Sequence, residues 1–565
     1  MQVSTPIAKT AIATVISTTL LSGCYWDDPE KAAKYVSNHI VQEDVVEHLV
    51  NLEARSSKTS DGSSITRAAG TQGYKLSLDY IIDVMTESGY DVVTQEFDFR
   101  AWEELAGTTL SVDNQTLTSV KDANQGVEAD FAVMSYSGNS NGAIAGELAF
   151  ITPDFRFDAP DYDSTDGCEA SDFTDLNVTN KIAVIQRGGC TFSAKVVNAQ
   201  QAGALAVIVF NQGNAEGRKD VVNGTLGSDS SATIPAFGAT FDLGKQWYQA
   251  SQNRPVSSTL SITVKDEMVL TQNVIAETKG GDDKQIVMLG AHLDSVPGGP
   301  GINDNGSGTA GLLEYATTLS TLKAPVKNKI RFAWWAVEEA GLVGSNYYTN
   351  DLFAPIYENA KTEIMTELEI GSEDQLTEAH YDLIEERYTA LNPVKLYLNF
   401  DMIGSPNYIF GVMDGDLSDT KESPDNAYTG TFEPPFGTSD IESTFIQFFN
   451  DRQFTTIPQA LSKRSDYAGF ADWGVAFGGL FTGAEKAKSA QEVEQYGGEI
   501  DVAYDVCYHK PCDDLNNVSY TALYINTQAL AYATTYYAFS TPIFPVEPEL
   551  PNASKPFYID GGSFA

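Results

Sequence analysis

Five short motifs in the second half of the chain bring together histidine and carboxylate side chains. They are AHLDSV at 291–296, GINDNGSG at 301–308, WAVEEAGLVGS at 335–345, NFDMIG at 399–404 and CYHKPCD at 507–513. The chain has 5 histidines, and two of them, His292 and His509, fall inside these motifs. This concentration of potential ligands directs attention to metal chemistry.

The residue types favour catalytic zinc. Imidazole and carboxylate ligands without a thiolate suit a zinc ion that keeps one position open for water. Three ligands per ion and one shared carboxylate would hold two ions about 3.5–4 Å apart. Taken singly, each motif has a simpler interpretation, because an aspartate after a strand is usually a turn or helix-cap residue. His292 alone fits a structural role equally well, but five motifs in this order favour a metal site.

Buried strands alternating with helices precede these motifs. Strands are predicted at 287–289, 330–337, 394–400 and 478–481, and helices at 311–322 and 520–539. Upstream, a helical lead-in (25–50), a helix (76–88) and a strand (92–99) are predicted. The alternation is typical of an α/β fold in which helices flank a largely parallel mixed sheet. The motifs should therefore lie at the carboxyl ends of the strands, where such sheets gather catalytic groups.

Residues 126–262 interrupt this pattern with short strands, many turns and loops rich in Gly, Asn, Asp and Ser. Within them, NKIAVIQRGGCTFSAK at 180–195 precedes a helix and a strand in 196–210. This order resembles the protease-associated (PA) domain, a small β-rich insert of secreted peptidases. A generic β-rich surface domain is the alternative, and neither interpretation places a catalytic residue here.

Together, the five motifs resemble those of the bacterial secreted di-zinc aminopeptidases, and the similarity covers nearly all of 40–540. That family shares a superfamily with vacuolar aminopeptidases, glutamate carboxypeptidases, glutaminyl cyclases and the transferrin receptor. The resemblance implies a zinc-dependent exopeptidase fold and two Zn²⁺ per chain. It also implies hydrolysis of the N-terminal peptide bond of peptides or proteins.

The matching positions imply a complete ligand set. His292 and Asp401 would hold one zinc. Glu339 and His509 would hold the other, and Asp304 would bridge the two. The family's cis peptide bond falls between Asp304 and the next residue.

The resemblance also implies the residues that act on the substrate. Glu338 would be the general base, and Tyr508 would support the oxyanion. Asp294 would orient His292 through the ring nitrogen that does not bind metal. The stretch GGLFTG at 478–483 resembles the wall of the pocket for the first side chain, which favours apolar first residues. The substrate-binding positions are Arg464, Asp466, Gly479 and Phe481.

Two features depart from the family pattern. The family often has a histidine where this chain has Tyr467, which affects the shape of the pocket rather than the metal site. The interval between Glu339 and Asp401 is long, and its residues 351–390 include 11 acidic and 2 basic residues in a helical pattern. We interpret 351–390 as an insert, either a lid over the site or a solvated surface elaboration, and charge runs are more often the latter.

The N-terminus predicts export. After Lys9, residues 11–21 are apolar but too short to span a bilayer, as in a signal peptide. The sequence LSGC at 21–24 resembles the lipobox of bacterial lipoproteins, whose cysteine is acylated; the alternative is an ordinary signal peptide with an incidental Cys24. Because Tyr25 rather than an aspartate follows Cys24, we expect anchoring at the outer membrane or cell surface, with shedding left open.

The cysteines agree with an oxidising compartment. There are 5, and with Cys24 lipidated the other four form two close pairs, Cys168 with Cys190 and Cys507 with Cys512. Such a compartment would join each pair, whereas unrelated free thiols are the alternative. Neither pair has the CxxC spacing of a zinc site. The first disulfide would cross-link the PA insert, which is worth about 3 kcal/mol for a loop of this size.

Size and charge set the remaining limits. The chain has 565 residues, more than one compact core usually holds. Its net charge of −42 argues against nucleic acid as a partner, because phosphate binding needs clustered basic residues. Peptide N-termini are the expected partners. The predicted domains are the signal peptide (1–24), the N-terminal part of the peptidase domain (25–125), the PA insert (126–262), the peptidase core (263–541) and a Pro-rich tail (542–565).

Three other functions fit the same superfamily. A glutamate-type carboxypeptidase would need a basic pocket for the substrate carboxylates, and the stretches CYHKPC and RSD favour the aminopeptidase instead. A glutaminyl cyclase is disfavoured because the ligand set for two metals is complete. A non-catalytic, receptor-like binding protein would be expected to lose ligands, and none is missing.

Overall fold

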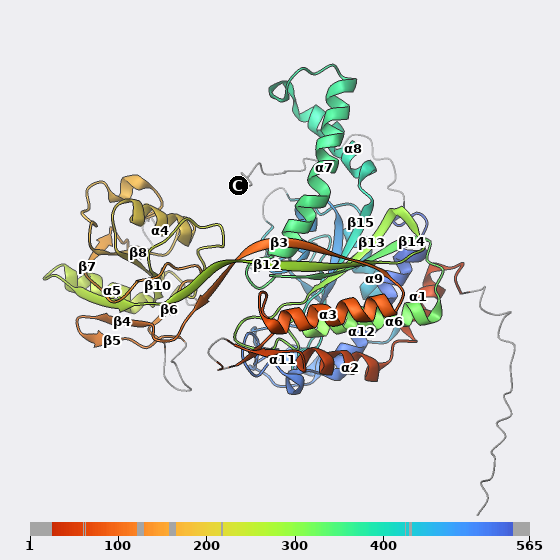
Figure 1. The fold of residues 1–565 in the computed structure, drawn as a ribbon, viewed down its shortest axis with the longest axis horizontal. Helices are drawn as coiled ribbons and strands as arrows, with labels where there is room; N and C mark the ends of the chain where they lie inside the picture. Colours follow the sequence, from red (N-terminus) through yellow and green to blue (C-terminus); the bar gives the residue numbers. More distant parts are fainter. Residues whose placement is uncertain are drawn as a thin grey trace, which may run out of the picture.

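The computed structural model describes residues 25–545 except 60–61, 63, 121–128, 158–164, 216–217, 424 and 429–431. The predicted signal peptide, Cys24 and most of the Pro-rich tail lie outside the described residues. Within them, two eight-stranded sheets form two domains that a long two-stranded ribbon connects (Figure 1). A small separate sheet pairs β1 (Ser57–Lys58) with β2 (Ile65–Thr66).

The first large sheet forms the peptidase domain. Its strands, in spatial order, are β17 (Ile457–Gln459), β16 (Gly411–Met413), β18 (Ala476–Phe481), β15 (Val394–Phe400), β13 (Asp282–His292), β14 (Asn328–Trp335), β12 (Val264–Glu277) and β3 (Asp91–Glu104). The central strands β18, β15, β13 and β14 run parallel, whereas β12, β3 and β16 pair antiparallel. The predicted α/β fold with a largely parallel mixed sheet is confirmed.

Helices cover both faces of this sheet, which explains why its central strands end in long buried runs of mostly apolar residues. One face packs against α1 (Pro29–Ser37), α2 (Gln42–Glu53), α3 (Gln72–Glu87), α6 (Gly306–Leu322), α9 (Thr438–Asp451) and α12 (Tyr520–Phe539). The other face packs against α7 (Val343–Glu367), α8 (Glu378–Leu391) and α10 (Tyr467–Asp472). A short helix, α11 (Ala490–Tyr496), precedes the last motif.

Two element boundaries differ from the predicted ones, each for a physical reason. Helix α6 begins at Gly306 rather than 311, because the Asn305 side chain caps it by accepting from the Gly308 N–H at 2.9 Å. Glycine is a poor helix former. Close packing explains the glycine at 308, because a Cβ there would lie 2.2 Å from the Phe400 carbonyl oxygen. Strand β14 ends two residues early because Val337 takes a left-handed φ of 62°.

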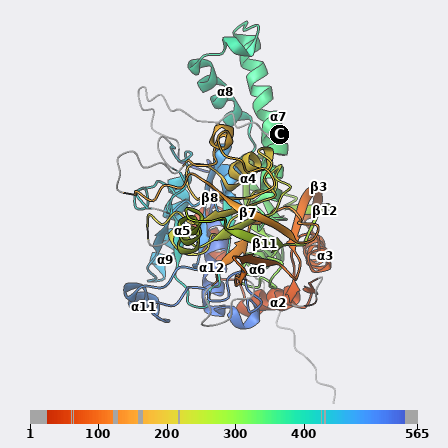
Figure 2. The same cartoon turned by 90° about the vertical axis from the view of Figure 1, so that its left-hand side faces the viewer.

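The ribbon of β3 and β12 leads from the peptidase sheet to the second domain. The two strands pair along all 14 residues of each, from Asp91↔Glu277 to Glu104↔Val264. Only the last four residues of β12 also pair with β14 among the described registers, so the remainder extends away from the sheet (Figure 1). Figure 2, turned by 90° about the vertical axis, shows the second domain in front of the peptidase domain.

The second sheet is the inserted β-rich domain. Its strands, in spatial order, are β5 (Gln115–Thr116), β4 (Thr109–Val112), β11 (Ser257–Ser261), β7 (Ile144–Ile151), β8 (Ile182–Gln186), β9 (Ala206–Phe210), β10 (Ala236–Ala239) and β6 (Phe131–Val133). Helices α4 (Phe192–Gln201) and α5 (Phe241–Ser251) pack on it. The insert begins before the predicted boundary at 126, because β4 pairs with β11 and so joins the insert's sheet.

The acidic segment 351–390 forms most of a helical hairpin. Helices α7 and α8 pack on each other and project from the peptidase domain (Figure 1). The two basic side chains of the segment form ion pairs within it: Lys361 with Glu358 and Glu373, and Arg387 with Glu363 and Glu367. In the part of the chain that the structure describes, none of the helices has the length and apolar character needed to cross a bilayer.

Candidate metal centre

The five motifs meet at the carboxyl ends of the parallel strands, as predicted. His292 is the last residue of β13, and Glu338 and Glu339 follow β14 after a short turn. Asp401 is the first residue after β15, and Asp304 lies just before α6. The fifth motif reaches the same place on a loop between α11 and α12 that carries His509. Residues more than 200 positions apart therefore form one site.

Asp304 lies between the two histidines of the site. Its Oδ1 is 3.2 Å from His292 Nε2, and its Oδ2 is 3.2 Å from His509 Nε2. Each oxygen of one carboxylate thus faces a different imidazole. This is the arrangement expected of a carboxylate that bridges two metal ions.

Each histidine also has a second carboxylate beside it. Asp401 Oδ1 lies 3.2 Å from His292 Nε2, and Glu339 Oε2 lies 3.0 Å from His509 Nε2. The ligand atoms of His292, Glu338 and Asp401 all lie within 4.8 Å of one another, and so do those of His292, Asp304 and Glu339. All five residues predicted as metal ligands are therefore gathered in one place.

Burial and charge make the site ready to receive cations. Burial raises the pKa of Glu338 well above its ordinary value and, together with the Asp304 carboxylate, raises the pKa of Glu339 to about 7. Burial would lower the pKa of His509, but the Glu339 and Asp304 carboxylates raise it to about 10. Burial would raise the pKa of Asp304, but its hydrogen bonds to His292 and His509 lower that pKa, so Asp304 remains an anion between the two imidazoles.

The residues present fit zinc. Imidazole and carboxylate are the ligands that catalytic zinc takes. Among the described residues, the buried Oε1 of Glu339 has no hydrogen-bond partner, although buried polar atoms are rarely left unpaired. A metal ion held by Glu339 and His509 would satisfy that oxygen.

Asp294 holds two parts of the site together. Its backbone carbonyl lies 3.0 Å from His292 Nδ1, so it accepts from that nitrogen and leaves Nε2 for a metal. Its carboxylate oxygens accept the backbone N–H groups of Glu338 at 3.1 Å and Glu339 at 3.4 Å. The side chain itself is 3.8 Å from His292 Nδ1, so the backbone makes the closer contact.

A chain of hydrogen bonds that the sequence analysis did not identify ends on Asp401. Trp335 Nε1 donates to the Tyr397 hydroxyl at 2.8 Å, which donates to Asn399 Oδ1 at 3.1 Å. Asn399 Nδ2 donates to Ser465 Oγ at 2.8 Å, and Ser465 Oγ donates to Asp401 Oδ2 at 2.6 Å. Each donor points toward the carboxylate, which leaves Oδ1 facing His292. The signal in the sequence was the alternation of polar residues at 397, 399 and 401: the first two share one face of β15, and the third follows its end.

Glu338 and Tyr508 lie where a base and an oxyanion donor are needed. Glu338 Oε2 is 3.9 Å from His292 Nε2, and the residue is 8% exposed. The Tyr508 hydroxyl accepts from Arg464 Nη2 at 3.0 Å, while Arg464 Nη1 pairs with Glu485 at 2.8 Å. Burial and the nearby carboxylates raise the pKa of Tyr508, so the phenol keeps its proton and remains a donor.

The other predicted substrate positions lie deeper. Asp466 is 1% exposed, and Gly479 is buried in β18 opposite Asn399. A Cβ at Gly479 would lie 2.2 Å from the Asn399 carbonyl oxygen, so close strand packing explains this glycine. Phe481, at the end of β18, is half-buried. Of the four predicted substrate positions, Arg464 and Phe481 are thus the two whose side chains are accessible to a substrate.

Both predicted disulfides are confirmed. Cys507 and Cys512 close the loop that carries His509 and are separated by 5 positions. Cys168 and Cys190, 22 positions apart, link the segment before β8 to the segment before α4 in the insert.

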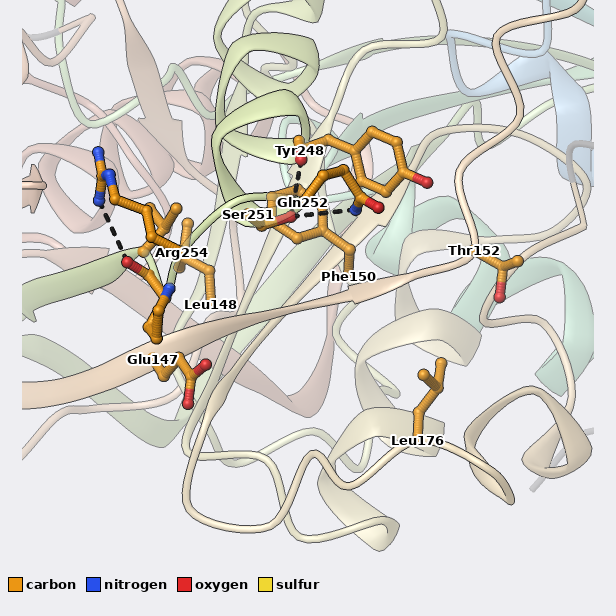
Figure 3. A pocket seen from close by; sticks show the side chains of 11 residues that line it. Glu147, Leu148, Phe150, Thr152, Leu176, Tyr248, Ser251, Gln252 and Arg254 are labelled. Carbon is orange, nitrogen blue, oxygen red and sulfur yellow. Dashed lines mark hydrogen bonds between the residues drawn. The ribbon is translucent and has the colours of Figure 1, made fainter.

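The insert has an open pocket of its own, of about 520 Å³, between β7 and α5 (Figure 3). Phe150, Tyr248 and Leu148 contribute apolar surface to it. None of the residues that line it belongs to the five motifs, so the pocket is separate from the metal centre.

Comparisons with known proteins agree with this architecture. The sequence model of peptidase family M28 matches residues 273–534, and that of the PA domain matches residues 146–247. An aminopeptidase of Pseudomonas aeruginosa (strain UCBPP-PA14) is 40% identical over 501 residues, which are 88% of this chain and 81% of that protein. Leucine aminopeptidase 2 of Trichophyton tonsurans is 35% identical over 514 residues, or 91% of this chain and 88% of that protein.

Solved structures share the fold. The aminopeptidase from Aneurinibacillus sp. strain AM-1 superposes with a TM-score of 0.62 at 21% identity, covering 92% of this chain and 100% of that chain. A zinc aminopeptidase from Bacillus subtilis gives a TM-score of 0.51 at 22% identity, covering 87% and 94%. The sequence identity to the curated relatives over most of both chains shows that this chain belongs to peptidase family M28, with a PA domain inserted before its catalytic core.

Proposed function

We propose that this protein is a zinc-dependent aminopeptidase that hydrolyses the N-terminal peptide bond of peptides or proteins with two zinc ions. The observation that carries the proposal is the position of Asp304, whose two oxygens each lie 3.2 Å from a different histidine. The similar proteins of Pseudomonas aeruginosa and Trichophyton tonsurans are named aminopeptidases, which supports the same activity for this chain.

The ligands divide into two pairs around the shared carboxylate. His292 and Asp401 would hold one zinc, and Glu339 and His509 would hold the other. Asp304 would be shared by the two ions. When bound, the zinc pair supplies an acidified water as the nucleophile and positive charge for the oxyanion.

The chain's own residues perform the proton transfers. Glu338 takes the proton of the attacking water and delivers it to the leaving amine; burial raises its pKa, which suits a group that must hold this proton. Tyr508, protonated and held by Arg464, donates a hydrogen bond to the oxyanion. Asp294 keeps the backbone of Glu338 and Glu339 in place.

The substrate is a peptide with a free N-terminus and an apolar first residue. The acidic side chains of the site attract the terminal ammonium, and the half-buried Phe481 offers an apolar contact for the first side chain. A panel of aminoacyl anilides and of N-acetylated and free peptides, assayed on the purified protein with zinc analysis, tests this. Zinc content of two per chain and release of apolar N-terminal residues are expected. Release of C-terminal glutamate instead would establish the carboxypeptidase alternative.

Export and lipid anchoring complete the proposal. The motif LSGC at 21–24 supports acylation of Cys24, and the two disulfides agree with an oxidising compartment. Detergent-phase partitioning of the exported protein should be lost in Cys24→Ala. Equal partitioning of the variant and the natural protein would contradict the lipid anchor.

A further inference from the structure

The turn at residues 300–304, here called the Asp304 turn, lies between two buried side chains from distant parts of the chain. We propose that Arg67 and Asp513 form a clamp that holds the Asp304 turn, and thereby sets the position of the bridging carboxylate. The inference rests on the proposed two-zinc function and adds two positioning residues to it.

Arg67 binds the carbonyl groups on one side of the turn. Its side chain is fully buried, with 0% exposed. Nε donates to the Pro300 carbonyl at 2.8 Å, and Nη2 and Nη1 donate to the carbonyls of Gly301 and Leu293. The planar fork of arginine thus reaches both ends of the loop between His292 and Asp304 at once.

Asp513 binds the N–H groups of the same turn. Its Oδ1 accepts from the Asn303 N–H at 2.9 Å and its Oδ2 from the Asp304 N–H at 3.1 Å. Its backbone carbonyl accepts from the Ile302 N–H at 3.0 Å. Three consecutive amides therefore end on one residue. Asn517 Nδ2 donates to Oδ1 at 3.1 Å and so fixes the orientation of the carboxylate.

The turn leaves no room for a side chain at Gly301. Gly301 has a left-handed φ of 61°, and a Cβ there would lie 2.2 Å from the Asp304 carbonyl oxygen and 2.5 Å from the Ser295 side chain. Carbonyls bound on one side and amides bound on the other determine the orientation of these peptide units. A rotation of the turn would move one Asp304 oxygen away from its histidine, and a bridging ligand must be held to within about 0.5 Å.

The clamp also joins the turn to the other ligand loop. Asp513 follows Cys512, the end of the disulfide-closed loop that carries His509. Asp505, before that loop, accepts from Asn303 Nδ2 at 2.7 Å and from Asn517 Nδ2 at 2.8 Å. The side chain that bridges the metals and the loop that supplies the second imidazole are thus held by the same group of buried residues.

The full-length protein with Asp513→Asn tests the clamp. An asparagine keeps the size but offers one acceptor oxygen where two are used, and it turns an NH₂ toward a backbone N–H. Arg67→Lys tests the other side, because an ammonium cannot reproduce the fork. Asp414→Asn is the matched control: Asp414 is 0% exposed and its carboxylate accepts the N–H groups of Ser418, Asp419 and Thr420, but it lies outside the five motifs.

Zinc affinity is measured by competition with a chelator, and the metal–metal coupling by spectroscopy of the cobalt-substituted proteins; melting of the metal-free proteins reports folding. We expect Asp513→Asn and Arg67→Lys to weaken zinc binding about 10–100-fold and to reduce the cobalt–cobalt coupling. The double variant should lose little more than the worse single variant, because both act on one turn. Asp414 lies in a separate carboxylate group with Asp416 and Glu442, so Asp414→Asn should lower the melting temperature without changing the cobalt–cobalt coupling or the zinc affinity of the two-histidine centre.

The natural protein must first prove to be a two-zinc peptidase. The clamp is then overturned if Asp513→Asn and Arg67→Lys both bind two zincs with unchanged affinity and unchanged cobalt–cobalt coupling. It is also overturned if Asp414→Asn weakens zinc as much as they do, because the effect would then be one of general stability. If the natural protein does not bind a pair of zinc ions, the proposed function itself is wrong. The zinc content of the natural protein alone distinguishes this outcome from a failure of the clamp. Arg67→Lys keeps the test informative if Asp513→Asn does not fold.

Discussion

The two halves of the metal centre are built in different ways. In the strand-end half, made of His292 and Asp401, each ligand lies at the end of a central strand, and His292 is 1% exposed. In the loop half, made of Glu339 and His509, both ligands lie on turns, and the His509 side chain is 39% exposed. His509 also has a left-handed φ of 58°. The sheet therefore positions one half, while loops must position the other.

This difference explains where the additional restraints are found. The hydrogen-bond chain from Trp335 to Asp401 follows strands β14 and β15 and passes through Ser465, which lies just before α10. The loop half instead relies on the Cys507–Cys512 disulfide and on the clamp at the Asp304 turn. We therefore expect the strand-end half to bind zinc more tightly and to release it last, and each prediction below tests one part of this contrast.

Removing the base should have the largest effect. Glu338 lies beside the strand-end half but is not assigned as a ligand, so Glu338→Gln should fold normally and keep two zincs. It cannot accept a proton, and turnover should fall by about 10²–10⁴-fold. Zinc analysis and kcat of the purified variant check this. Loss of a zinc from Glu338→Gln would show that the roles of Glu338 and Glu339 are reversed.

Glu339→Gln should affect the metal first and activity as a consequence. The glutamine weakens a ligand of the loop half, so one zinc should be lost and excess zinc should partly restore activity. Equilibrium dialysis at rising zinc concentration, followed by turnover, measures both. Full activity with two zincs in Glu339→Gln and in Glu338→Gln would place the catalytic site elsewhere.

Opening the Cys507–Cys512 disulfide should have an intermediate effect, restricted to the loop half. The double variant Cys507→Ala/Cys512→Ala frees the loop that carries His509, and we expect one of the two zincs to bind about tenfold more weakly. The double variant Cys168→Ala/Cys190→Ala is the control, since that disulfide lies in the insert and should leave zinc binding unchanged. Equal zinc loss in both variants would contradict a local role for the Cys507–Cys512 bond.

The strand-end half was also the easier one to predict from the sequence. Its apolar strands and the motifs that follow them have a regular pattern, so 394–400 and 520–539 were predicted with the observed bounds. The disulfides followed from the spacing of the cysteines. The roles of the ligands, in contrast, came from the resemblance to a family rather than from the pattern of residues.

The supporting contacts were not predictable, because they join residues far apart in the chain. Arg67 lies 226 positions from Leu293, whose carbonyl it binds, and nothing around it signals a partner. Ser465 lies 64 positions from Asp401, and nothing in the stretch RSD distinguishes this serine as the partner of a metal ligand. The start of the insert was placed too late because β4 joins its sheet through a pairing with β11, about 150 residues further on.

Interrupting the hydrogen-bond chain should have an effect no larger than that of opening the disulfide, and the effect should decrease with distance from the metal. Ser465→Ala removes the hydrogen bond to Asp401 Oδ2, a contact of 2.6 Å to a charged group. We expect about tenfold weaker zinc binding in the strand-end half, in line with the cost of losing such a contact. Trp335→Phe removes the first donor, three bonds further away, and should change affinity less than threefold, because polarisation strengthens each bond of a chain by only about 10–30%. Chelator competition on both variants measures the two zincs separately. If Ser465→Ala instead weakens the zinc of the loop half, the division of the centre into two separately supported halves is wrong.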